Sequence, residues 1–144
     1  MTKETSVAVI YHCAQNSEKA IRNRPKLQRR LQRAIEDMVE DGFSSFILPI
    51  GGRSPFPTIF IDAIIAERSH NPNIRLTILR PHEDEPFTLT AYTQHADEVI
   101  YSPKETLLDR SAALIIYHEK YCSQLNHLTH HAHRNRLPLI HINI

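Results

Sequence analysis

Short apolar runs rich in β-branched residues alternate with segments of helical periodicity along the whole chain. The runs are apolar at consecutive positions rather than at every second one, which is typical of parallel strands buried on both faces. They predict strands at residues 7–11, 46–48, 74–79, 99–101, 114–117 and 139–142. Because strands alternate with helices, we predict a three-layer, Rossmann-like α/β domain with a mostly parallel sheet of about five to six strands.

Helices are predicted between these runs. Residues 26–42 place five apolar side chains on one helical face before the stop signal at Gly42. Residues 54–69 are expected to form a second helix, with Ser54 as N-cap and Pro55 at the first helical position. The segment 122–136 predicts the last helix, and shorter helices are expected within 86–96 and 104–112.

The composition fits one ordinary soluble domain. The chain has 144 residues, 41% of them hydrophobic, and a net charge of +1, so no overall field points to nucleic acid or to a membrane. No apolar run approaches the ~20 residues that span a bilayer, and the amino terminus does not resemble an export signal. Cys13 and Cys122 have no metal or redox spacing and are expected to be free thiols. We therefore expect a single cytoplasmic domain, residues 1–144, without membrane contact.

Basic and histidine side chains follow the predicted strands. Ligands of open parallel sheets bind outside the carboxyl ends of the strands, whereas the amino ends here are neutral or acidic. This asymmetry favours an anionic ligand such as a nucleotide or another phosphorylated small molecule. The alternative is that polar residues follow the strands simply because strand ends meet solvent. The candidate ligand-binding residues are His12, Gly51, Gly52, Arg53, Ser54, Arg80, Lys104 and His118.

The stretch GGRSP, residues 51–55, resembles a phosphate-binding turn, with two glycines between a strand and a helix N-terminus. Arg53 beside it would add a guanidinium that can grip phosphate through two hydrogen bonds. The stretch matches neither GxGxxG nor a Walker motif, and a tight strand-to-helix turn explains a glycine pair equally simply. Pro55 and Pro57 also remove two N–H donors from the first turn.

The first long helix has a basic face, from Arg22 to Arg33, which raises a nucleic-acid or protein surface as an alternative. Asp37 and Glu40 continue that face, and no aromatic residues interleave with the cations. A solvated amphipathic face is therefore the better interpretation, and nucleic acid is the less favoured partner.

The sequence favours metal or thiol chemistry less than it favours an anionic ligand. Four histidines of the last helix could suggest a metal: His127, His130, His131 and His133. Zinc needs three or four ligands, and the first three of these point away from the apolar stripe of the helix, so we expect no metal and no cofactor. Cys13 near His12 and His118 could form a thiol–imidazole pair, although a cysteine at a strand end is more often a small apolar residue.

Five stretches together resemble the SLOG superfamily of Rossmann-like domains, in particular its YpsA-like branch. The resemblance spans roughly residues 30 to 142 and is one of pattern. It implies a nucleotide-derived ligand over the strand carboxyl ends, held by glycine-rich turns. The stretches are AIEDMVEDGFSSFILPIGG, IDAIIAER, HADEVIYSPK, LLDRSAALIIYHE and HRNRLPLIHINI.

Several family motifs are replaced in this chain. The glycine expected after the first strand is replaced by Tyr11-His12-Cys13, and Ala112 replaces an acid before the fifth strand. Another branch of the superfamily consists of phosphoribohydrolases, in which a Gly-Gly turn is followed by a catalytic glutamate on the next helix. The resembling helix of this chain offers only Asp62 as an acid near that position. We therefore expect ligand binding without catalysis. The alternatives are a hydrolase or transferase acting on a nucleotide N-glycosidic bond, with Asp62 or Glu119 as acid–base group, and an interaction module using the basic helix. A homo-oligomer across the apolar final strand is also conceivable.

Overall fold

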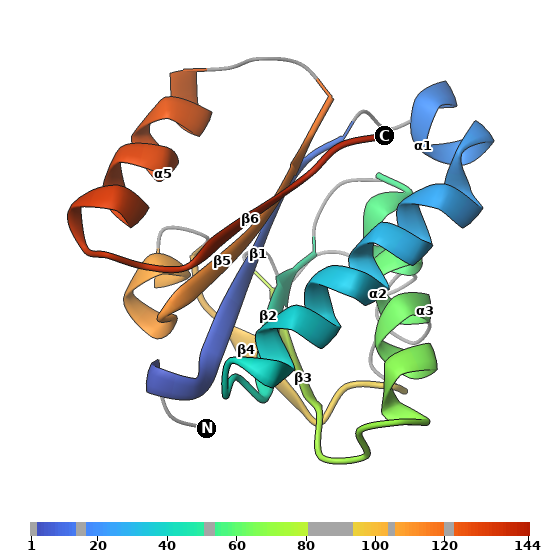
Figure 1. Cartoon of the computed structure of the whole chain (residues 1–144), viewed down its shortest axis with the longest axis horizontal. Coiled ribbons are helices and arrows are strands. Elements are labelled where there is room, and N and C mark those ends of the chain that lie inside the picture. The colour runs from blue at the N-terminus through green and yellow to red at the C-terminus, as the bar shows by residue number, and fades with distance from the viewer. Residues whose placement is uncertain (1–2, 14–16, 51–53, 81–93, 104–105, 120–122) are drawn as a thin grey trace.

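The computed structural model describes residues 3–13, 17–50, 54–80, 94–103, 106–119 and 123–144. It is an α/β domain in which helices cover both faces of one sheet (Figure 1). The prediction of a three-layer, Rossmann-like arrangement is confirmed.

The sheet has six strands in the order β4-β3-β2-β1-β5-β6, and every paired neighbour is parallel. Each apolar run of the sequence corresponds to one strand, because side chains on both faces of the central strands are buried. The strands are β1 (Ser6–His12), β2 (Ser45–Pro49), β3 (Arg75–Arg80), β4 (Glu98–Tyr101), β5 (Ala113–His118) and β6 (Leu139–Ile142).

The predicted long helices are present with small changes at their ends. They are α2 (Arg24–Glu40), α3 (Phe56–Arg68) and α5 (Ser123–Arg134), and a short α1 (Glu18–Arg22) that was not predicted precedes α2. Short 3-10 turns occur at η1 (Lys3–Thr5) and η3 (Leu108–Arg110). In the described part of 104–112, where a short helix was expected, the chain forms 3-10 turns, η3 among them, and no α-helix. Most of 86–96 lies outside the described residues.

Two hydrophobic clusters separate the faces of the sheet. The larger one joins β1, β2, β3 and β5 to α1, α2 and α3, and the smaller one joins the opposite faces of these strands to α5 and η3. All five apolar side chains predicted to face the core from α2 are buried there: Leu27, Leu31, Ala34, Ile35 and Met38. Gly42, with a φ of 99°, ends this helix in the left-handed conformation that favours glycine.

The charges of α2 run against the helix dipole. Its first turn has no acidic residue and its last turn has no basic one, whereas a helix dipole favours acids at the N-terminus and bases at the C-terminus. Arg33 and Asp37 meet near the middle as an exposed ion pair, 3.4 Å apart. The helix is thus basic in its first half and acidic in its second half.

Candidate functional site

The strand order creates a switch point between β1 and β5. From β1 the chain builds outward through β2 and β3 to β4, and it then returns to the other side of β1 with β5 and β6. Successive crossovers therefore diverge at the carboxyl ends of β1 and β5, which is where ligands bind in open α/β sheets. His12 and His118 face each other in register at these two strand ends.

Alternation along the strands divides the predicted site between the two faces of the sheet. His12 and His118 follow Ile10 and Ile116, which pack on the α5 side, so these histidines lie on that side. The His118 ring lies edge-on to the His141 ring of β6, with centroids 5.7 Å apart. Burial, followed by the neighbouring His118, lowers the pKa of His141. This face is therefore a histidine surface beside α5.

The opposite side of the switch point carries a hydrogen-bonded group of side chains that we call the switch-point cluster: Cys13, Ser17, Tyr117 and Glu119. The Glu119 carboxylate accepts a hydrogen bond from the Tyr117 hydroxyl at 2.9 Å and a short one from the Ser17 hydroxyl. The same Ser17 oxygen accepts from the N–H of Ala20 and so caps α1. One carboxylate thereby ties the end of β5 to the start of α1.

Cys13 lies within this cluster rather than beside the histidines. Burial raises the pKa of its thiol, and the Glu119 carboxylate adds to the rise, although hydrogen bonds with Ser54 and Ser17 oppose it. Burial and the same carboxylate also raise the pKa of Tyr117. The thiol is therefore protonated at neutral pH and is a weak nucleophile. The alternative of a thiol–imidazole pair is not favoured, since Cys13 packs on the α2–α3 side, whereas His12 lies two residues after Ile10 and so on the α5 side.

A stack of aromatic rings packs next to the switch-point cluster. The Phe56 ring stacks with the rings of Tyr11, Tyr117 and Phe60, at centroid distances of 4.6 Å, 5.3 Å and 6.2 Å respectively. The Tyr11 hydroxyl donates to the carbonyl of Pro49 at 2.7 Å. The stack thus joins the ends of β1, β2 and β5 to the first turn of α3.

Ser54 lies at the start of α3, as predicted, but one residue further from the helix. The helix begins at Phe56 and Pro55 occupies the cap position, while the Ser54 hydroxyl accepts from the N–H of Phe56 at 3.2 Å. The preceding Gly51, Gly52 and Arg53 lie outside the described residues, and so does Lys104.

Arg80 and Asp62 form contacts outside the switch-point cluster. Arg80, at the end of β3, is only 6% exposed, and its guanidinium donates to the Tyr101 hydroxyl at 3.3 Å and lies over that ring. Asp62 forms an ion pair with Arg24 at 2.5 Å, which links α3 to α2. Of the two candidate acid–base groups, only Glu119 belongs to the switch-point cluster.

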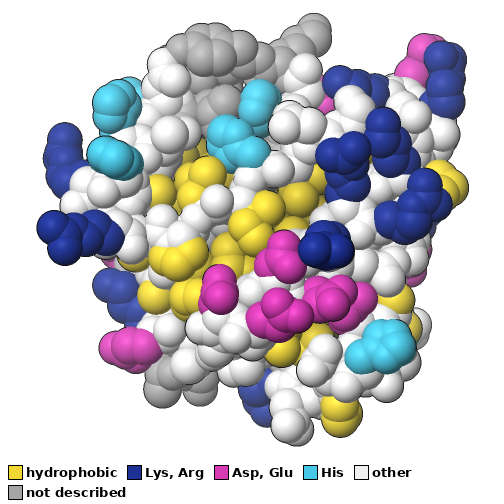
Figure 2. All heavy atoms as spheres, viewed as in Figure 1, with side chains coloured by type: hydrophobic (Ala, Val, Ile, Leu, Met, Phe, Trp, Pro, Cys, Tyr) yellow, Lys and Arg dark blue, Asp and Glu magenta, His cyan; other side chains and the backbone are white. Residues whose placement is uncertain are grey.

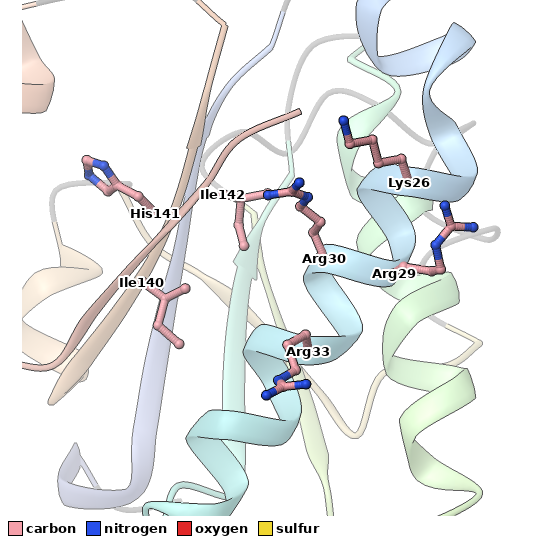
Figure 3. A pocket seen from close by; sticks show the side chains of 7 residues that line it. All are labelled: Lys26, Arg29, Arg30, Arg33, Ile140, His141 and Ile142. Atoms are coloured by element: carbon pink, nitrogen blue, oxygen red, sulfur yellow. The ribbon is translucent and has the colours of Figure 1, made fainter.

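A second feature lies between α2 and the edge strand β6. Lys26, Arg29, Arg30 and Arg33 line an open groove of about 530 Å³ together with three residues of β6, namely Ile140, His141 and Ile142. Figure 3 shows Ile140 and Ile142 on the side of β6 that faces α2, Arg30 reaching toward the strand and His141 on its other side. We call this feature the α2–β6 groove.

Part of this groove was foreseeable. The basic helical face is visible in the sequence, but its position beside an edge strand is not. Figure 2 shows an apolar strip across this side of the molecule, with one group of Lys and Arg side chains to its right, Asp and Glu below that group, and further Lys and Arg side chains at the left edge of the view. In the described part of the chain, Lys26, Arg29 and Arg30 form no ion pair.

Metal and membrane functions find no support in the described residues. Within them no group of three or more potential ligands could hold a metal ion, and His127, His130 and His133 of α5 are exposed. Nor does any helix there combine the length and apolarity that crossing a membrane requires.

Comparison with known proteins adds no assignment. No protein-family model and no curated protein sequence matches this chain. The resemblance to the SLOG superfamily therefore stays a prediction.

Proposed function

We propose that this protein binds a nucleotide or another phosphorylated small molecule at the carboxyl edge of its sheet, over the switch point between β1 and β5, and does not transform it chemically. The observation that carries the proposal is the coincidence of this switch point with the switch-point cluster. Open parallel sheets bind ligands at such positions because the strand ends and the helix N-termini converge there.

The described residues suggest how the ligand would be held. The Glu119 carboxylate is an acceptor for sugar hydroxyl groups, and its hydrogen bonds from Ser17 and Tyr117 fix its orientation. Ser54 stands at the N-terminal end of α3, where the helix dipole favours a phosphate. Gly52 and Arg53, which directly precede Ser54 in the sequence, are the expected phosphate contacts.

Binding without turnover is favoured by the state of the nucleophile and acid–base candidates. The thiol of Cys13 has a raised pKa and is protonated at neutral pH. Asp62 is paired with Arg24 and lies outside the switch-point cluster. The hydrolase alternative thus depends on Glu119 alone.

Thermal denaturation with a ligand panel tests this proposal. Inorganic phosphate, ribose 5-phosphate, AMP and ADP are added separately, and a ligand present at 100 times its Kd stabilises the fold by about 2.7 kcal/mol. For a domain of this size that corresponds to a rise in Tm of roughly 5–10 °C. The absence of any shift at millimolar concentration would contradict the proposal.

Variants locate the site. Arg53→Ala and Glu119→Gln should each weaken binding of the stabilising ligand at least about tenfold, the loss expected for a charge-assisted hydrogen bond. The matched control is His133→Ala, an exposed change on α5 that should leave affinity unchanged. Unchanged affinity in both site variants would place the ligand elsewhere. Release of free base from AMP that disappears in Glu119→Gln would instead establish the hydrolase alternative.

A further inference from the structure

One side of α2 carries a row of charges that changes sign halfway along the helix. We call it the α2 charge stripe: Lys26, Arg30, Arg33, Asp37 and Glu40. These residues are three or four positions apart and therefore fall on one side of the helix. Lys26, Arg30 and Arg33 line the α2–β6 groove, so the stripe borders its apolar floor, which is formed by the partly buried Ile140 and the buried Ile142.

The charges of the α2 charge stripe make few stabilising interactions within their own chain. The helix dipole opposes a cation in the first turn of α2, such as Lys26, and a carboxylate in the last turn, such as Glu40. Among the described residues, Arg33 and Asp37 pair with each other, whereas Lys26 and Arg30 form no ion pair. A second molecule that brings carboxylates to Lys26 and Arg30 would satisfy them.

Four of the five positions of the stripe are complementary to the reversed stripe, and the fifth, Arg33, lies at its centre and faces its own copy. When two copies of α2 lie antiparallel, Lys26 of each faces Glu40 of the other, and Arg30 of each faces Asp37 of the other. A two-fold axis near the middle of the helix produces both contacts twice, as isologous interfaces require. No other strand of the sheet blocks the approach, because β6 is at the edge of the strand order.

We propose that the α2 charge stripe and the apolar floor of the α2–β6 groove form an interface with a second copy of this chain, in which the two α2 helices lie antiparallel. The apolar strip in Figure 2 supplies a surface that the partner covers, and the flanking charges fix its orientation. This inference is independent of the ligand proposed above, which binds at the carboxyl edge.

Charge reversal tests the orientation directly. Sedimentation of the full chain at about 100 μM in low salt should show a dimer, and its dissociation should increase with added salt because exposed charges are screened. Lys26→Glu with Arg30→Glu, and separately Asp37→Lys with Glu40→Lys, should each weaken dimerisation at least tenfold. Each double variant relieves the conflict with the helix dipole, so loss of the dimer would not reflect unfolding, and thermal melts verify this.

Recombination of the reversed charges is the decisive step. An equimolar mixture of the two double variants should restore a dimer, because each copy then faces opposite charges, and the quadruple variant should dimerise by itself. Arg75→Glu with Arg134→Glu is the matched control, since both residues are exposed and lie outside α2. A monomeric wild-type protein, double variants that remain dimeric, or a mixture that stays monomeric would each overturn the proposal.

Discussion

The switch-point cluster and the α2 charge stripe are both polar surfaces, but they differ in where their partners lie. Glu119 is satisfied by Ser17 and Tyr117 of its own chain, above a buried stack of rings. Lys26 and Arg30 are exposed and form no ion pair within the described residues. A satisfied group contributes to the folded state, whereas an exposed charge without a partner is free to contribute to association. Changes at the cluster should therefore affect stability, and changes at the stripe should not.

The largest effect is expected from the base of the cluster. Phe56→Ala removes a ring that is 0% exposed and contacts Tyr11, Tyr117 and Phe60, and should lower the free energy of unfolding by about 3–5 kcal/mol. Urea denaturation measures this loss. Ile65→Ala on the same helix is the control, since Ile65 is 40% exposed and should cost well under half as much. A loss below about 1 kcal/mol in Phe56→Ala would show that the cluster does not depend on its aromatic base.

An intermediate effect is expected at alkaline pH. The pKa of Tyr117 is raised in the folded state above its ordinary value of 10.0, and that of Cys13 above 9.0. The unfolded chain therefore loses these protons first, so stability is complete below about pH 9 and falls as the pH rises further. Above pH 10, Tyr117 alone should contribute a fall approaching about 1.4 kcal/mol per pH unit.

Tyr117→Phe checks the origin of this fall, since it should flatten the decrease in unfolding free energy between pH 10 and 11 that chemical denaturation measures. Identical slopes in the wild type and in Tyr117→Phe would contradict the assignment to Tyr117.

The smallest effect is expected at the stripe. Arg30→Ala should change the free energy of unfolding by no more than about 0.5 kcal/mol, since it removes an exposed side chain that forms no ion pair with the described residues. The measurement is made at low micromolar concentration, where association contributes least. A loss above about 1 kcal/mol would remove the distinction between the two regions.

The sequence predicts the layers of this fold well because strands that are buried on both faces are apolar at consecutive positions. Strands such as β2, buried at every residue, cannot be mistaken for half-exposed ones. The short α1 was missed because five residues do not display a helical period. The helix α3 starts one residue later than predicted, at Phe56, although Pro55 already adopts helical dihedrals.

The candidate site was predicted less completely. Glu119, His12 and His118 were identified because they follow apolar runs, but the contact between Ser17 and Glu119 spans 102 positions and depends on β1 and β5 being neighbours. Strand order is a property of the whole chain and has no local signature. The division of the strand-end residues between two faces likewise required the register of β1 and β5.

The hydrogen bond from Tyr117 to Glu119 also gives the protein an optical reporter. The chain contains no tryptophan and five tyrosines, so its ultraviolet emission comes from phenol rings alone. A carboxylate that accepts a hydrogen bond from a phenol weakens its emission, so we expect Tyr117 to emit weakly in the folded protein. Emission should increase when this bond is broken, which allows the state of the switch-point cluster to be followed without any label.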